Sequence, residues 1–204
     1  MRSVNVNMSK TRLEAFSDGV IAIIITIMVL EMKVPAKPDI ALLAKVWPVF
    51  INYIMSFIYV GIYWNNHHHM FHIVRSINGG ILWANLHLLF WLSMVPFVSS
   101  WMGESPFSAV WPMAFYGFVL LMNSIAYAIL VIKLTKHEGK ESPLAIAFGK
   151  DWKGKISIVV YVVAIAMAWV STYVSFALYV GVACMWFIPD RRIEIKLAEE
   201  QHAK

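Results

Sequence analysis

Four histidines within a six-residue stretch are the side chains of this sequence best suited to bind a metal ion. They are His67, His68, His69 and His72. His68 and His72 are four residues apart, so a helix would present both imidazoles on one face, as in helical zinc sites. A zinc site needs three or four ligands, however, and residues 65–80 contain no Asp, Glu or Cys. The cluster is incomplete, and the sequence predicts no metal site.

One carboxylate, Asp18, lies inside the first long apolar run. If this run crosses a membrane, the acid costs about 2.5–3.5 kcal/mol on insertion scales. Each apolar residue between positions 20 and 30 favours insertion by about 0.3–0.6 kcal/mol, and together these contributions exceed the insertion free energy that Asp18 costs. The helix is therefore expected to insert. Asp18 still needs hydrogen-bond partners, which must come from another helix or from water.

The sequence offers little support for catalysis. It has no Ser-His-Asp order, no metalloprotease motif and no phosphate-binding loop. We therefore expect neither an enzyme nor a bound cofactor.

The composition indicates an integral membrane protein. Apolar residues make up 60% of the chain and charged residues 14%, with a mean hydropathy of +0.66. Soluble domains have roughly 45–50% apolar and 25% charged residues. The net charge of +5 comes from basic residues in short loops between apolar runs, which is typical of membrane topology. We expect contact with a lipid bilayer and no nucleic-acid partner.

The apolar runs predict an all-α fold in one domain, residues 1–204. A spanning helix needs about 20 mostly apolar residues, and four runs have that length. The last apolar stretch, 156–189, is too long for one helix, and its most polar interior lies at 171–175. We expect a tight reversal there, which gives six transmembrane helices. Their predicted ranges are 12–32, 42–64, 81–101, 109–132, 156–171 and 174–189.

The distribution of Lys and Arg predicts the orientation. With six helices and the N-terminus inside, 14 of the 17 basic residues fall in cytoplasmic segments and three in the first outer loop. The positive-inside rule therefore places both termini in the cytoplasm.

Helical geometry separates two faces of the first helix. At 100° per residue, Ile23, Ile27 and Leu30 fall within about 60° of one another, and Asp18 projects about 140° away from Ile23. Spacing alone favours a ladder of aliphatic side chains that faces lipid or the protein core.

Two sequence elements resemble the transmembrane protein 175 family of potassium channels. The first is Arg12-x-x-x-Phe16-Ser17-Asp18 at the start of the first helix. The second is Trp64-x-x-His67-His68, followed by Leu82-Trp83-x-Asn85-Leu86. The resemblance extends over essentially the whole chain, and the length matches prokaryotic members with one six-helix unit per chain.

The resemblance implies a homotetramer in the prokaryotic plasma membrane, with four copies of the first helix around a central pore for K+. Ile23 would form the narrowest hydrophobic ring, with Ile27 and Leu30 stacked above it. Thr26 matches a hydroxyl position of more selective members, whereas Ala22 stands where another would have Ser, so K+ over Na+ selectivity should be modest. A polar network between the first three helices is also implied, formed by Arg12, Ser17, Asp18, Trp64, His67 or His68, and Asn85.

An alternative is a proton-coupled or divalent-metal transporter built around Asp18 and the histidines. A transporter needs a central polar site, often on broken helices. The first helix beyond Gly19 is unbroken and almost wholly apolar, which favours the channel.

Overall fold

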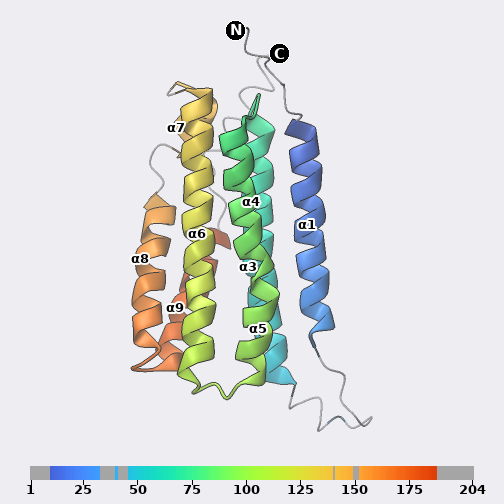
Figure 1. Cartoon of the computed structure of the whole chain (residues 1–204). Coiled ribbons are helices and arrows are strands. Elements are labelled where there is room, and N and C mark those ends of the chain that lie inside the picture. Colours follow the sequence, from blue (N-terminus) through green and yellow to red (C-terminus); the bar gives the residue numbers. More distant parts are fainter. Residues whose placement is uncertain (1–9, 33–39, 41–45, 140, 149–151, 188–204) are drawn as a thin grey trace.

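The computed structural model describes residues 10–32, 40, 46–139, 141–148 and 152–187, and every regular element among them is an α-helix (Figure 1). Residues 33–39, which fall in the predicted first outer loop, and both ends of the chain lie outside these residues. The helices are α1 (Lys10–Leu30), α3 (Trp47–Ile73), α4 (Gly79–Ser93), α5 (Val95–Glu104), α6 (Val110–Glu138), α7 (Pro143–Phe148), α8 (Trp152–Met167) and α9 (Thr172–Phe187).

Four helical segments of the described residues are long and apolar enough to cross a membrane. They are α1, α3, the joined α4 and α5, and α6. The helices α8 and α9 have 16 residues each, which makes each about 24 Å long. They form an antiparallel pair at the side of the bundle opposite α1 (Figure 1). The chain is thus an all-helical multi-pass membrane protein.

The helix α6 lies at the centre of the packing, against α4, α5, α8 and α9, whereas α1 packs against α3, α4 and α5 (Figure 1). Buried tyrosines fill the space around α6. Tyr59 Oη donates to the carbonyl oxygen of Tyr179, and Tyr179 Oη donates to the carbonyl oxygen of Met113 at 3.2 Å. These two hydroxyls satisfy their hydrogen-bonding capacity inside the protein while their rings pack in the core.

The third predicted helix, 81–101, is divided in the structure. One helix ends at Ser93 and the next starts at Val95, with Met94 as the shared cap. Pro96 explains the division, because it has no N–H to continue the α4 ladder and is well accommodated in the first turn of α5.

The reversal between α8 and α9 occurs at residues 168–171, slightly before the predicted position. Ser175 lies inside α9 and is buried. A hydroxyl is therefore no marker of a loop in this part of the chain.

The two ends of the bundle differ in charge. The starts of α1 and α4 and the ends of α3 and α6 lie together at one end, while α8 starts and α9 ends part of the way along the bundle toward that end (Figure 1). Every Lys and Arg of the described residues lies at that end, which we call the basic end, or at the start of α8 nearest to it. At the opposite end, the charged side chains of the described residues are Glu31 and Glu104. The basic residues concerned are Lys10, Arg12, Arg75, Lys133, Lys136, Lys153 and Lys155.

Candidate functional site

The helix α1 packs on its own subunit along one narrow stripe. The buried side chains recur every three or four residues, which is the spacing of a single helical face. All other faces of α1 are partly or fully exposed in the single chain. The buried residues are Leu13, Ser17, Ile21, Ile24 and Met28.

The aliphatic ladder singled out in the sequence lies outside this stripe. Ile23 is 58% exposed, Ile27 40% and Leu30 79%, whereas the neighbouring Ile24 is only 3% exposed. Thr26 is also exposed, and its Oγ1 donates to the carbonyl oxygen of Ile23 at 2.8 Å. The chain therefore presents three large aliphatic side chains that its own fold leaves uncovered.

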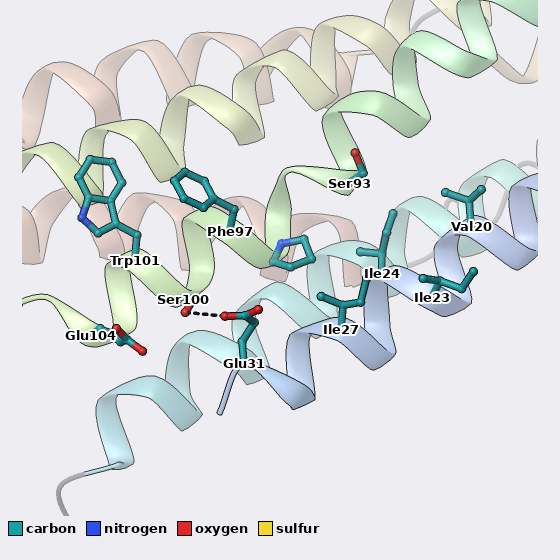
Figure 2. Close-up of a pocket in the computed structure, with 11 residues that line it drawn as sticks. Val20, Ile23, Ile24, Ile27, Glu31, Ser93, Phe97, Ser100, Trp101 and Glu104 are labelled. Carbon is teal, nitrogen blue, oxygen red and sulfur yellow. Dashed lines mark hydrogen bonds between the residues drawn. The ribbon is translucent and has the colours of Figure 1, made fainter. Parts of the chain in front are cut away.

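A groove of about 810 Å³ runs between α1 and α5, beside the ladder (Figure 2). Its walls are mostly apolar, and two carboxylates, Glu31 and Glu104, line it at the end opposite the basic end. Ser100 Oγ donates to Glu31 Oε2 at 3.4 Å. The other lining residues are Val20, Ile23, Ile24, Ile27, Ser93, Pro96, Phe97, Ser100 and Trp101.

The sequence prediction did not include the α5 wall of this groove. No short motif marks Phe97 or Ser100, and their position depends on how α5 packs against α1. Pro96 is the one local signal, because it breaks the preceding helix and allows α5 to take its own direction.

A buried chain of hydrogen bonds joins three helices near the basic end. Ser17 Oγ of α1 accepts from Asn85 Nδ2 of α4 at 2.9 Å and donates to the carbonyl oxygen of Leu13 at 2.9 Å. Asn85 Oδ1 lies 2.7 Å from His67 Nε2 of α3. Since an amide oxygen only accepts, the imidazole donates here. Ser17, His67 and Asn85 are all buried, so each bond satisfies a polar group that water does not reach.

Asp18 lies beside this chain and has a different partner. Trp64 Nε1 of α3 donates to Asp18 Oδ1 at 3.0 Å. The Trp64 ring stacks on His68, with centroids 5.8 Å apart. The structure therefore separates the two histidines: His67 bonds to Asn85, and His68 stacks on Trp64. Arg12 lies in the first turn of α1 and is exposed.

The remaining histidines do not form a metal centre in the structure. Among the described residues, no group of three or more His, Cys, Asp or Glu is placed to hold a metal ion. The rings of His68 and His72 stack with centroids 6.4 Å apart. His87 has a local role, since its Nε2 accepts from Trp91 Nε1 at 2.9 Å.

Comparisons with known proteins agree on one family. A family model described as the endosomal/lysosomal potassium channel TMEM175 matches residues 12–96. A potassium channel of Chryseobacterium sp. (strain P1-3) is 54% identical over 192 residues, covering 94% of this chain and 100% of that relative. The human endosomal/lysosomal proton channel TMEM175 is 38% identical over 81 residues, covering 34% of this chain and 16% of that protein.

A solved structure extends the likeness to the fold. The crystal structure of a lysosomal potassium-selective channel TMEM175 homologue from Chamaesiphon minutus matches with a TM-score of 0.76 and 28% identity, over 89% of this chain and 97% of that chain. The segment matched by the family model contains the aliphatic ladder and every residue of the polar network.

Proposed function

This chain belongs to the TMEM175 family of potassium channels, and from that premise we propose that four copies assemble into a potassium-permeable channel whose pore is lined by α1. The resemblance expected from the sequence is confirmed, as is the expectation that the chain is not an enzyme, because the family is one of ion channels. The tetramer, the pore helix and its constriction are the parts that we propose.

The exposed ladder on α1 is the observation that carries this proposal. Ile23, Ile27 and Leu30 stay uncovered in the single chain, while a different stripe of α1 is buried against α3, α4 and α5. A single subunit supplies one such helix, so a closed pore requires several copies around a symmetry axis. In a tetramer, four Ile23 side chains would form the narrowest ring.

A ring of isoleucines offers an ion no ligands. The sequence has no Thr-Val-Gly-Tyr-Gly loop whose carbonyl oxygens could replace the hydration shell. Ions would therefore pass at least partly hydrated, through a constriction that gates by wetting and dewetting. K+ would be preferred over Na+ because its hydration shell is easier to distort. Thr26 already bonds to its own backbone, which supports only modest selectivity.

The groove between α1 and α5 would widen the pathway at the end opposite the basic end. Its carboxylates, Glu31 and Glu104, would raise the local concentration of cations there. All Lys and Arg of the described residues lie at or toward the other end, which supports a cytoplasmic location for that end in a prokaryotic plasma membrane.

The polar network would hold the pore helix in place. Ser17 and Asp18 are the points of α1 that bond to α4 and α3. We assign them to positioning α1 and not to ion coordination, since Ser17 is fully buried and Asp18 lies on a different face from Ile23.

Flux measurements on purified protein in liposomes test the proposal directly. We expect K+ flux driven by a gradient, weaker Na+ flux, and a reversal potential that shifts modestly when one ion replaces the other. Strict exchange of cations for protons would instead support the transporter alternative, and the absence of flux for both ions would refute the channel.

A further inference from the structure

The last residues of α6 bind the connection between α3 and α4, residues 74–78. Glu138 Oε1 accepts from the backbone N–H groups of Arg75 at 2.9 Å and Ser76 at 3.4 Å. His137 Nε2 lies 3.0 Å from Ser76 Oγ, and His137 Nδ1 lies 3.1 Å from Asn78 Nδ2. Both nitrogens of one imidazole are therefore engaged by a five-residue connection.

Asn78 has its orientation fixed by a second role. It is the N-cap of α4, and its Oδ1 accepts from the backbone N–H of Ile81 at 3.0 Å. The oxygen must face Ile81, so the Nδ2 group must face His137. An amide nitrogen only donates, which makes His137 Nδ1 an acceptor and leaves the ring proton on Nε2, where it donates to Ser76 Oγ. The observed bonds thus require a neutral His137.

We propose that His137 and Asn78 form a pH-operated latch that controls how firmly the start of α4 is held at the basic end. Protonation would place an N–H on Nδ1, directly opposite the N–H groups of the Asn78 amide, and two donors cannot bond to each other. Asn78 could turn its oxygen to His137 only by releasing Ile81, which would uncap α4. Histidine side chains change charge between about pH 5 and 8, so the latch would open on acidification.

The latch is linked to the pore helix through α4. Asn85 lies seven residues after Asn78, about 10 Å along the helix. Asn85 bonds to Ser17 of α1 and to His67 of α3. A looser start of α4 would therefore weaken the support of α1, and this consequence for current rests on the proposed channel function.

Other charged groups of the described residues surround the latch. On α6 these are Lys133, Lys136 and Glu138, and Lys133 Nζ reaches Gly80 at the start of α4. The connection contributes Arg75, and the turn before α7 contributes Glu141. At the end of α3 there is a second imidazole, His72, whose ring stacks on His68 and which provides a matched control. The first turn of α4 carries no titratable side chain.

Two substitutions separate the latch from other effects of pH. His137→Gln keeps a donor and an acceptor but does not titrate. Asn78→Asp keeps the N-cap while replacing the amide donor with an acceptor, which accepts from Nδ1 of a protonated His137 and also from Nδ1 of a neutral His137 in its other tautomer. The measurements are K+ flux in liposomes as the pH at the basic end changes from 8 to 5.5, and hydrogen exchange of residues 75–82 at the same pH values.

The K+ flux of the wild-type protein should fall about threefold on acidification. Hydrogen exchange of residues 75–82 in the wild-type protein should rise by a similar factor, relative to His137→Gln measured at the same pH. The flux of His137→Gln should lose most of this response, His72→Gln should keep it, and Asn78→Asp should not show the wild-type fall, because its carboxylate accepts from His137 Nδ1 at both pH values. A full response in His137→Gln, or the wild-type direction in Asn78→Asp, would overturn the latch. If the wild-type protein carries no K+ flux at any pH, the proposed channel function fails, and the exchange data alone decide the latch.

Discussion

Ile23 is the residue on which the proposed constriction depends most. Replacing it with Asn would add four polar side chains to the narrowest ring and make the dry state less favourable. We expect a several-fold higher single-channel conductance and a reversal potential that discriminates K+ from Na+ less well. Bilayer recording with each cation in turn measures both quantities.

Val29→Asn is the matched control for this experiment. Val29 is 43% exposed, comparable to Ile27, but projects about 120° away from Ile23 on the same helix. It should change conductance much less than Ile23→Asn. Equal effects at the two positions would mean that another face of α1 lines the pore.

Asn85 and His67 should behave as one energetic unit, because their 2.7 Å bond is buried between α4 and α3. Asn85→Ala should lower the free energy of unfolding by about 1–3 kcal/mol, since it leaves partners unsatisfied. In a double-mutant cycle with His67→Phe, a coupling of about 0.5–2 kcal/mol is expected. Unfolding in mixed micelles measures it, and a cycle of Asn85→Ala with His87→Phe should be additive.

The sequence predicted part of this site at the level of single residues. The polar residues of the network belong to the two sequence elements that resemble the family, and that resemblance implied the set in advance. The choice between His67 and His68 could not be made, because these neighbours project about 100° apart and only the packing of α3 decides which one faces α4. The α5 wall of the groove could not be predicted for the same reason, because its position depends on how α5 packs against α1.

At the scale of helices, Gly117 sets how closely α6 approaches α9. A Cβ at this position would overlap the Tyr179 ring, whereas a Cβ at Gly61 on α3 would meet open space. Gly117→Ala should therefore destabilise the bundle by about 1–3 kcal/mol, the usual cost of overpacking, while Gly61→Ala should be nearly neutral. Thermal unfolding in detergent compares the two variants.

The attribution to Tyr179 has its own check. The Tyr179→Leu variant is destabilising by itself, because Tyr179 is buried and its hydroxyl bonds to Met113, so the comparison is a double-mutant cycle. Gly117→Ala should cost less stability in the Tyr179→Leu background than in the wild type, because the shorter side chain leaves room for the new methyl group. If the cost is the same in both backgrounds, the contact between α6 and α9 is not the cause.

Helix positions were easier to predict than helix ends. Long apolar runs must cross the bilayer as helices, because the backbone has no other way to satisfy its hydrogen bonds there. The exact reversal before α9 was harder to place, since Ser and Thr can bond to their own helix backbone and need not mark a turn. Thr135 of α6 does so, with its Oγ1 2.9 Å from the carbonyl oxygen of Val131.

For the whole molecule, the proposal requires an assembly of four chains. Mass measurement in a mild detergent should give a particle of four 23.3 kDa subunits after correction for bound detergent. The same sample, returned to liposomes, should conduct K+. A stable monomer or dimer that retains full flux would contradict the tetrameric pore.

The short hairpin of α8 and α9 has a consequence for the surrounding membrane. Each helix is about 24 Å long, whereas the hydrocarbon core of a bilayer is about 30 Å thick. Because the hairpin lies on the side of the subunit away from α1, it would form the outer perimeter of the proposed tetramer. Lipids at that perimeter must compress to cover it, at a cost that rises with acyl-chain length. The stability of the assembled channel is therefore tied to hydrophobic mismatch, and it should be greatest among lipids with short chains.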